Sequence, residues 1–485
     1  MNRAEFFRRL SDHAAFRPGS VALADGTGTR VRWRDLPDLV AAAAAEVESA
    51  TPRSLGLLAG NGVPWVLADL AALSTATPVV PLPGFFSDGQ LTHALRVALP
   101  DVVATDDPDR IPRVAPGAVA LGTSVAGLDL FATGARGGSG PVADRITFTS
   151  GTTGAPKGVC LRTEGMLGVA SSLALALASG PADRHLALLP LAILLENLGG
   201  VWRSLLAGGG LVLPKLTLLG VKGATGADGG AILDSLEAAR ATTVILMPAH
   251  LRAVVDELAR GRRPPPALRF AGVGGARVPP KDLLRARTAG FPAFEGYGLS
   301  EASSVVSLNL PGADRPGSVG RPLPHAKVRV SKAGEVLVRG ALFAGYVGDA
   351  TPPPTGEFWP TGDLGRIDDD GYLHLLGRKR EFLVTAYGRN VSPAWLEERL
   401  LESGTISHAV VFGEGRAQPA AVVSCPTGPD AAGEVVRRVN GLLPDYARIA
   451  TFALRADLPP AGTCAERERL GALLGKECTW VSTND

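Results

Sequence analysis

Short strand-like runs that alternate with helical stretches constrain the fold of this chain more than any other feature of its sequence. Apolar, β-rich runs at 54–58, 77–81 and 102–105 are accompanied by Ala- and Leu-rich stretches at 41–50 and 65–73. The same alternation resumes between Arg184 and Ala293, where we expect strands at 244–247 and 268–273 and helices at 251–260 and 280–289. Strands that alternate with helices form parallel sheets with helices on their faces. The pattern therefore predicts two α/β subdomains.

The pattern changes near Gly317. Short strands separated by Gly, Pro and Asp are expected at 326–330, 334–339 and 372–376, which predicts a small β subdomain. After Gly377, helices at 393–401 and 431–443 and strands at 409–412 and 420–424 predict a smaller α+β unit. We expect an α/β fold with a large N-terminal domain of two α/β subdomains plus the small β subdomain, followed by a small α+β C-terminal domain.

Charge and cysteine content exclude several classes of protein. With 49 Lys and Arg against 47 Asp and Glu over 485 residues, the chain is nearly neutral, which argues against a general nucleic-acid or membrane-surface protein. The four cysteines form no C-x-x-C pair and no zinc-ligand spacing, so a reducing cytoplasm fits best. The longest apolar run, 186–195, is far short of the roughly 20 residues of a membrane helix, so no integral membrane segment is expected.

A loop after the strand-like run at 146–149 has the composition of an anion site. Its hydroxyl residues are Thr149, Ser150, Thr152 and Thr153, its glycines include Gly151 and Gly154, and its cation is Lys157. Glycines let backbone N–H groups approach phosphate oxygens, and lysine adds a mobile positive charge. Because Pro precedes the lysine and Gly follows it, the string is not a Walker A loop. Composition alone leaves a solvent-exposed Gly/Thr hairpin as the alternative.

The full string, F-T-S-G-T-T-G-A-P-K-G-V, resembles the phosphate-loop signature of the ANL superfamily of adenylate-forming enzymes, which includes acyl-CoA synthetases, peptide-synthetase adenylation domains and luciferases. The resemblance implies that Thr149, Ser150, Gly151, Thr152 and Gly154 bind the phosphates of ATP. It also implies catalytic roles for Thr153 and Lys157, and ATP, Mg²⁺ and CoA as the cofactor and co-substrates.

Tyr297-Gly298-Leu299-Ser300-Glu301 resembles the next superfamily motif. The resemblance implies a nucleotide-binding role for Tyr297, Gly298 and Ser300, and a catalytic, metal-binding role for Glu301, because Mg²⁺ prefers oxygen ligands. Gly274, Gly275, Ala276 and Glu295 complete the implied adenine pocket. Without the family context, a packed tyrosine beside a surface glutamate would explain the string equally well.

Two further motifs resemble the ribose site and the junction between domains. In Thr361-Gly362-Asp363 the aspartate would accept bonds from the ribose hydroxyls, and Arg378 would also reach the ribose. Arg380 occupies the hinge position, where Asp or Lys is usual. The resemblance thus implies an AMP-binding domain at 1–376, a hinge at 377–381 and a mobile C-terminal domain at 382–485. An aspartate in a turn and a solvated charge run are the alternatives.

The sequence departs from the family pattern at two places. In the segment 189–196, near the implied acyl pocket, Ile193 stands where a histidine is common, whereas Glu196 matches the long-chain fatty-acid branch. We expect Ile193, Glu196 and Trp202 at this pocket, with a purely apolar core helix as the alternative. Near the C-terminus the family has a catalytic lysine, and the nearest match here is Arg467, a planar donor that does not replace a compact ammonium conservatively.

The resemblance implies ATP-dependent activation of a carboxylic acid as acyl-AMP, with release of pyrophosphate and transfer to a thiol, most simply CoA. The apolar segments that should wall the acyl pocket favour a fatty or other apolar acid. Three alternatives stay open: an enzyme that loads an acyl carrier protein, an enzyme that forms an amide or N–N bond, and a degenerate protein that binds ATP or acyl-AMP without efficient turnover.

Overall fold

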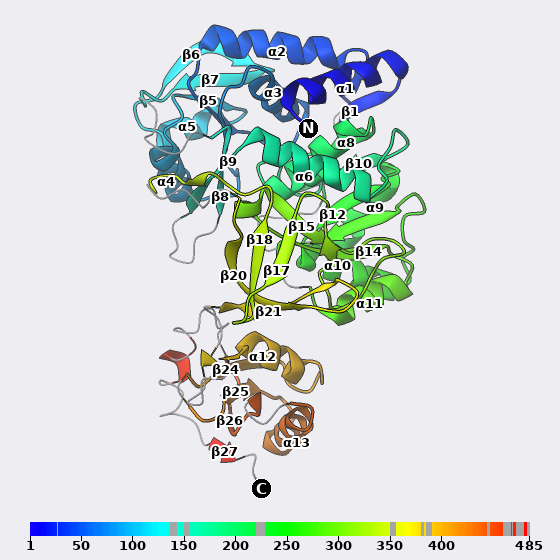
Figure 1. Ribbon diagram of the computed structural model, residues 1–485, viewed down its shortest axis with the longest axis vertical. Helices are drawn as coiled ribbons and strands as arrows, with labels where there is room; N and C mark the ends of the chain where they lie inside the picture. Colours follow the sequence, from blue (N-terminus) through cyan, green and yellow to red (C-terminus); the bar gives the residue numbers. More distant parts are fainter. Residues whose placement is uncertain are drawn as a thin grey trace. The chain divides into compact units, whose positions relative to one another are not determined.

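The computed structural model describes the chain in two compact units (Figure 1). Unit 1 comprises residues 1–328, 338–359 and 368–373, and unit 2 comprises residues 329–337, 360–367 and 374–485. The structure describes all residues except 27, 136–142, 150–155, 220–227, 277, 350–355, 380–382, 385–389, 415, 444–446, 459–466, 468, 472–479 and 483–485.

Unit 1 contains an eight-stranded sheet with the order β19-β9-β8-β4-β3-β5-β7-β6. The strands are β3 (Leu55–Leu58), β4 (Val79–Pro81), β5 (Val102–Thr105), β6 (Val119–Val125), β7 (Leu128–Ala132), β8 (Arg145–Thr149), β9 (Lys157–Leu161) and β19 (Gly345–Tyr346). The central strands β4, β3 and β5 pair in parallel, as the alternation predicts. Its helices include α2 (Leu36–Ala50), α3 (Val63–Ser74), α4 (Asp88–Ala98) and α5 (Ile111–Val114).

A second sheet of unit 1 has nine strands in the order β16-β15-β14-β13-β12-β10-β11-β1-β2. They are β1 (Val21–Asp25), β2 (Arg30–Arg32), β10 (Arg184–Leu186), β11 (Gly210–Leu213), β12 (Thr243–Leu246), β13 (Phe270–Val273), β14 (Ala293–Leu299), β15 (Ser304–Leu308) and β16 (Arg321–Pro322). From β1 to β14 the neighbours pair in parallel. Thus β1, near the start of the chain, joins strands that follow it by almost two hundred residues in the printed sequence.

Helices of unit 1 cover these sheets and bury two large apolar clusters. They are α1 (Arg3–Phe16), α6 (Thr163–Ala176), α7 (Leu194–Glu196), the π-helical turn η2 (Asn197–Trp202), α8 (Arg203–Leu206), α9 (Gly229–Ala238), α10 (Pro248–Ala259) and α11 (Pro280–Thr288). Helix α3 is buried along most of its length, which explains its nearly continuous apolar sequence. Among the described helices, none is both long enough and apolar enough to cross a membrane.

The segment 189–196 is helical only in its last three residues, so most of it does not form the core helix that is the alternative interpretation. Strand β10 ends at Leu186, and helical structure begins only at Leu194. Pro190 lies between the two, and a proline disfavours helical backbone at the residue before it. The residues between β10 and α7 therefore form a mostly buried connecting segment that leads from the sheet into α7, η2 and α8.

Unit 2 holds most of the small β subdomain together with the C-terminal α+β fold. One sheet has the order β17 (Lys327–Val330), β18 (Glu335–Arg339), β20 (Trp359–Ile367) and β21 (Leu373–Arg378). A second has the order β24 (His408–Phe412), β25 (Ala420–Ser424), β26 (Thr451–Leu454) and β27 (Trp480–Ser482), with helices α12 (Pro393–Leu401) and α13 (Pro429–Asn440). The short strands β22 (Leu383–Val384) and β23 (Asn390–Val391) pair with each other.

The division into units differs from the domain bounds expected at 1–376, 377–381 and 382–485. Strand β21 runs through Gly377 and ends at Arg378, so the expected start of the hinge lies inside a strand. Most of β18, β20 and β21 groups with the C-terminal residues, because sheet pairing joins them more strongly to one another than to unit 1. The hinge itself remains a prediction, since Arg380 lies outside the described residues.

Candidate active site

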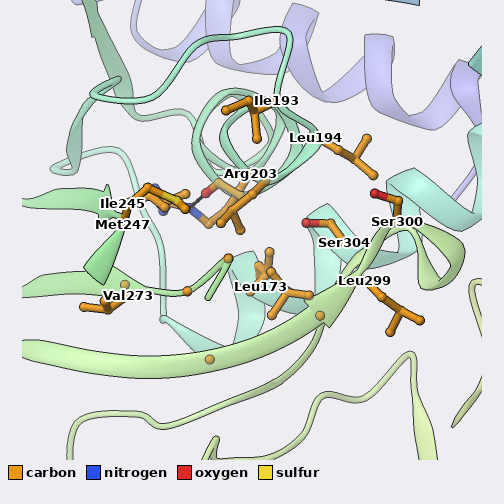
Figure 2. A pocket seen from close by; sticks show the side chains of 18 of the residues that line it. Leu173, Ile193, Leu194, Arg203, Ile245, Met247, Val273, Leu299, Ser300 and Ser304 are labelled. Carbon is orange, nitrogen blue, oxygen red and sulfur yellow. Dashed lines mark hydrogen bonds between the residues drawn. The ribbon is translucent and has the colours of Figure 1, made fainter. Parts of the chain in front are cut away.

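A cavity of about 390 Å³ opens in unit 1 along strands β12, β13 and β14 (Figure 2). Seven of the predicted site residues line it: Thr149, Ile193, Gly274, Gly275, Tyr297, Gly298 and Ser300. Figure 2 shows Ser300 and Ser304 on one side of this cavity and Ile245 and Met247 on the other. The carboxyl ends of parallel strands are where α/β sheets bind ligands, and the predicted nucleotide residues gather there.

Two other predicted nucleotide residues do not line the cavity. Glu295 is buried in β14, where its Oε1 accepts a bond from the Val278 backbone N–H at 3.4 Å. Ala276 is exposed and follows the glycines that do line it. The backbone at Gly275 has a φ of +81°, a left-handed conformation that glycine adopts without strain. This turn carries the chain from β13 past Met247, whose Sδ would lie 2.9 Å from an added Cβ.

The phosphate loop itself lies mostly outside the described residues, since Ser150, Gly151, Thr152, Thr153 and Gly154 are not described. Its two ends are described. Thr149 ends β8, Lys157 begins β9, and the two residues face each other across an antiparallel pair. The loop therefore joins the two strands of a β-hairpin. Both the exposed-hairpin alternative and the phosphate-site interpretation require such a hairpin. The surroundings of Lys157 favour the second.

Tyr346 brings Lys157 and Glu301 together. The Tyr346 hydroxyl donates a hydrogen bond to Glu301 Oε1 at 2.7 Å, and the Lys157 Nζ lies 5.7 Å from the centroid of the Tyr346 ring. Strand β19 sets this position because Tyr346 pairs with Val159, two residues after the lysine. The Phe343 backbone N–H also donates to the Glu301 carbonyl at 2.8 Å. A cation and a carboxylate are thus fixed beside one aromatic ring.

Sequence reasoning did not identify Tyr346. The only available signal was its place as one of five tyrosines in the chain, in a Gly-Tyr pair before a turn, and that signal is weak. Phe343 packs edge-on against its ring at a centroid distance of 5.0 Å and also contacts Trp359 at 5.0 Å. These aromatic contacts hold the ring in place.

Glu301 suits a role as a Mg²⁺ ligand. It is half-buried in the short turn η4 (Ser300–Ala302), and Oε2 has no hydrogen-bond partner among the described residues. Mg²⁺ in nucleotide enzymes is held by one or two carboxylates together with the phosphates of the substrate. No cluster of three or more His, Cys, Asp or Glu that could hold a metal occurs in the described part of the chain.

In unit 2, Asp363 and Arg378 form an ion pair, with Arg378 Nε 2.8 Å from Asp363 Oδ1. Asp363 is buried within strand β20, and the preceding Gly362 has a φ of +76°. The neighbouring Lys379 pairs with Glu335 at 2.9 Å. The two residues predicted for the ribose therefore lie together, and the charge run at 378–379 is paired with carboxylates of the same sheet.

Arg467 does not have the free, exposed position expected of a catalytic cation. It is 7% exposed and forms an ion pair with Glu397, a carboxylate that also accepts a bond from the Val411 backbone N–H at 2.7 Å. Burial raises the pKa of Glu397 although the Arg467 charge opposes the shift. The catalytic role of Arg467 stays a prediction, and in this structure the arginine neutralises a buried carboxylate of the C-terminal fold.

Of the three residues predicted for the acyl pocket, one lines the cavity. Ile193 lines the cavity, but Glu196 and Trp202 do not. Glu196 is buried and accepts bonds from His185 Nε2 at 2.6 Å and from the Leu189 N–H at 3.0 Å. Trp202 belongs to the core, where its Nε1 donates to Asp69 Oδ2 at 2.9 Å. A buried carboxylate and a buried indole each need a partner, and both find one behind the cavity wall.

Three buried polar residues that the sequence did not single out line one end of the cavity. They are His185, Arg203 and Thr243, and each is about 1% exposed. Burial lowers the pKa of Arg203 to about 10 and also lowers the pKa of His185. In the sequence each of these residues is a polar residue next to an apolar run. Composition alone cannot tell whether such a residue binds a ligand or only makes structural hydrogen bonds.

Comparison with known proteins places these residues in a family. The family model described as "AMP-binding enzyme" matches residues 10–347, and the model described as "AMP-binding enzyme C-terminal domain" matches residues 380–457. The chain belongs to the AMP-binding enzyme family. Its α/β fold with a smaller C-terminal α+β unit, and the superfamily indicated by its motifs, are thereby confirmed.

Relatives of this AMP-binding enzyme include named CoA ligases. A long-chain-fatty-acid–CoA ligase of Mycobacterium bovis is 44% identical over 134 residues, which are 27% of this chain and 22% of that protein. A 2-succinylbenzoate–CoA ligase of Bacillus velezensis is 32% identical over 284 residues, 55% of each chain. The matched segments thus span about half or less of the length of these relatives.

A solved structure with the same fold is the O-succinylbenzoate coenzyme A synthetase from Bacillus subtilis in complex with ATP and magnesium ion. It matches with a TM-score of 0.72 and 21% identity and covers 94% of this chain and 97% of its own. At this level of identity the similarity establishes the fold of the AMP-binding enzyme alone.

Proposed function

We propose that this chain activates a carboxylic acid with ATP and transfers the acyl group to the thiol of CoA. The observation that carries the proposal is the arrangement of Lys157, Tyr346 and Glu301 close to the strand ends that line the cavity. Membership of the AMP-binding enzyme family and the names of the CoA-ligase relatives support it.

In the first step a carboxylate oxygen of the acid attacks the α-phosphorus of ATP. The bond between that phosphorus and the oxygen bridging to the β-phosphate breaks, and pyrophosphate leaves. The protein's part is positioning and neutralisation of charge, because the reaction needs no covalent intermediate with the chain. Lys157 would follow the charge on the phosphates, Glu301 would hold Mg²⁺, and Mg²⁺ when bound would neutralise the leaving pyrophosphate.

In the second step the sulfur of CoA attacks the acyl carbon, the bond to the AMP oxygen breaks, and AMP leaves. The thiol proton is lost to solvent, since no residue of the chain is assigned as its acceptor. Asp363 and Arg378 would hold the ribose, and a hinge at 377–381 would let a mobile domain at 382–485 change position between the steps. Cys160 is no alternative nucleophile, because burial raises the pKa of its thiol to about 11.

The walls of the cavity favour an acid with an apolar body, so fatty and aryl acids are the proposed substrates. The apolar wall includes Leu173, Ile193, Leu194, Ile245, Met247 and Phe270. An acyl carrier protein in place of CoA remains a variant of this proposal, as does an acceptor that forms an amide. The proposed location is the cytoplasm.

Exchange of labelled pyrophosphate into ATP, measured with a panel of fatty and aryl acids, tests the first step. We expect acid-dependent exchange, and a loss of at least about 100-fold in Lys157→Ala and in Glu301→Ala, the size typical for removing a charge that stabilises a transition state. Lys281→Ala, which removes an exposed lysine of α11, is the matched control. Full exchange in either site variant would disprove the assignment. Mass spectrometry then identifies the acceptor, by detecting either acyl-CoA or a carrier protein to which the acyl group has been attached.

A second candidate function is binding of ATP or acyl-AMP without efficient turnover. The observation that favours it is the ion pair between Arg467 and Glu397, which leaves that arginine unavailable as a substitute for the family's catalytic lysine. Absence of exchange with every acid, together with retained ATP binding in calorimetry, would select this function over the first.

A further inference from the structure

The cavity follows the strands of the sheet from their carboxyl ends to their amino ends. On β12, Thr243, Ile245 and the following Met247 alternate with residues of the opposite face, so the three side chains share the face toward the cavity. Thr243 begins the strand and pairs with Phe270, which begins β13, whereas Gly274 follows the end of β13. At about 3.3 Å per residue, Thr243 lies roughly 10 Å along the strand from its carboxyl end.

Glycines keep this path open. A Cβ on Gly272 would lie 3.1 Å from the Phe270 ring, and a Cβ on Gly199 would lie 3.1 Å from Ile245 Cδ1. Both glycines line the cavity. Glycine at both positions avoids crowding these side chains, and the cavity of about 390 Å³ extends as far as Arg203 and Thr243.

At the amino ends of these strands the cavity is closed by a chain of hydrogen bonds in which each donor and acceptor can be assigned. Arg203 Nη2 donates to Thr243 Oγ1 at 3.0 Å, and Thr243 Oγ1 lies 3.0 Å from His185 Nδ1. His185 Nε2 lies 2.6 Å from Glu196 Oε1, and this carboxylate can only accept when ionised. Nε2 therefore carries the proton, and Nδ1 accepts from the Thr243 hydroxyl.

Arg203 is a buried cation whose immediate hydrogen-bond partners are all neutral. Besides Thr243 and His185 they are the Gly199 carbonyl at 2.6 Å, the Ser179 hydroxyl at 2.7 Å and the Ser204 hydroxyl at 3.1 Å. Nη1 has a single described acceptor, Ser179, for its two hydrogens. Neither nearby carboxylate bonds directly to the guanidinium: Asp183 acts on it through space, and the His185 imidazole separates it from Glu196. Burying a charge without a directly bonded counter-charge is costly, and a bound anion would offset that cost.

We propose that Arg203, held in place by Thr243, forms a distal subsite for an oxygen acceptor, most favourably a carboxylate, carried at the far end of a compact acid substrate. The proposal rests on the proposed function and specifies its substrate class: an acid with a short apolar or aromatic body and a second polar end. The body contacts Ile193, Ile245 and Met247, and the distal oxygen accepts from Arg203. A long alkyl chain ending in a methyl group would meet the buried cation instead, so it is a poor substrate.

Matched acids test the subsite. Octanoate and suberate share the same chain and differ in a second terminal carboxylate, and palmitate represents a long chain. In acid-dependent pyrophosphate exchange we expect kcat/KM for suberate to exceed that for octanoate at least tenfold, with palmitate the poorest of the three. Octanoate or palmitate preferred over suberate by the unmodified protein would overturn the proposal.

Substitutions test which residues cause the expected preference for suberate over octanoate. Arg203→Met removes the charge at similar volume and is expected to bring the suberate-to-octanoate ratio to one or below, whereas Arg203→Lys keeps a cation and is expected to retain part of the preference. An unchanged ratio in Arg203→Met would overturn the proposal. If Arg203→Met does not unfold in a cooperative thermal transition, Thr243→Val takes its place as the test. This variant removes one hydroxyl and is expected to lower the suberate-to-octanoate ratio severalfold. An unchanged ratio in Thr243→Val would also overturn the proposal.

Direct binding separates this subsite from the catalytic proposal. Calorimetric titration of suberate and octanoate into the full chain requires no turnover. Tighter binding of suberate that is lost in Arg203→Met would support the subsite even if no acid gives exchange, in which case only the catalytic proposal fails. Equal binding of the two acids would disprove the subsite, whatever the exchange assay shows.

Discussion

Tyr346 links two segments that the sequence keeps far apart. Its hydroxyl contacts the half-buried carboxylate of Glu301, and its ring faces the Lys157 ammonium, so one side chain orients both proposed ATP-binding charges. The motifs identify the lysine and the glutamate from their own neighbours in sequence. The tyrosine is recognisable only once β19 pairs with β9, because that pairing is non-local.

Tyr346→Phe is expected to raise the Mg²⁺ and ATP concentrations needed for half-maximal exchange by roughly tenfold, with little change in KM for the acid. A hydrogen bond to a charged group contributes about 1.5–3 kcal/mol, and about 1.4 kcal/mol corresponds to a factor of ten. The measurement is initial exchange rate against Mg²⁺ concentration, together with calorimetric binding of Mg²⁺-ATP. Tyr372→Phe, in another buried tyrosine of unit 1, is the control. Identical Mg²⁺ dependence in the two variants would contradict the positioning role.

Arg467→Ala is expected to destabilise unit 2 before it affects any catalytic step. Removal of one partner leaves the buried Glu397 without its counter-charge, and breaking a buried ion pair in this way typically costs about 3–5 kcal/mol. Differential scanning calorimetry should show a lower unfolding temperature, partly recovered when Glu397→Gln is added. The control is Arg469→Ala, since Arg469 is exposed. An unchanged transition combined with a large loss of exchange would support the catalytic role for Arg467.

The strands β14 and β15 carry the Tyr297 motif on a hairpin with an unusually close approach of its two backbones. A Cβ on Gly298 would lie 1.9 Å from the Ser304 carbonyl oxygen, so the motif glycine allows the strands to pair where the register shifts. Both Gly298 and Ser304 line the cavity. The geometry of this element, and not only its side chains, therefore shapes the proposed nucleotide site.

Gly298→Ala is expected to separate the two strands, to lower the free energy of unfolding by about 1–3 kcal/mol as overpacking does, and to weaken ATP binding more than acid binding. Gly168→Ala is the control, because Gly168 lies within α6 with no atom within 4 Å of an added Cβ. That control should gain up to about 1 kcal/mol from helix propensity. Chemical denaturation and ATP titration provide the measurements, and full ATP affinity in Gly298→Ala would show that the hairpin tolerates the wider spacing.

Strongly patterned elements could be predicted from the sequence, whereas those made by distant pairing could not. The strand at 102–105 and the helix at 393–401 have the bounds that we expected, since each is marked by an apolar run or by a Ser-Pro start. The positions of Glu196 and Trp202 behind the cavity wall could not be predicted, because their burial depends on His185 and Asp69, which lie elsewhere in sequence. The polar cavity end was missed for the same reason.

The division of the whole chain into two compact units also depends on pairing between β-strands, which cannot be read from the sequence. Motif order gave the family and the overall α/β class, both of which the family match confirms. The change from α/β to short-strand patterns near Gly317 is visible in sequence, but the grouping of β18, β20 and β21 with the C-terminal residues is not. A composition change marks where a new subdomain begins, whereas contacts between strands decide the unit to which it belongs.

Two buried histidines and one partly buried histidine predict that the protein loses stability in mild acid. Burial lowers the pKa of His185, His250 and His325, that of His325 to about 4. Below the ordinary histidine pKa of about 6.5, the unfolded chain binds protons that these folded imidazoles do not, so the free energy of unfolding falls as pH drops from 6.5 toward 4. Each such histidine contributes up to about 1.4 kcal/mol per pH unit within its window. Glu397 acts in the opposite direction, because its raised pKa lets the folded state bind a proton first.

Denaturant unfolding at pH 7, 6 and 5 should therefore show a falling free energy of unfolding, with the steepest loss below pH 6.5. His325→Asn removes one of the three groups and is expected to flatten the profile, whereas His408→Gln, at an exposed position of β24, should leave its slope unchanged. Equal slopes in the unmodified protein and in His325→Asn would mean that the folded state accepts a proton at this histidine as readily as the unfolded chain does. In that case the acid sensitivity would have to come from His185 and His250, and the corresponding His185→Gln profile would separate those two.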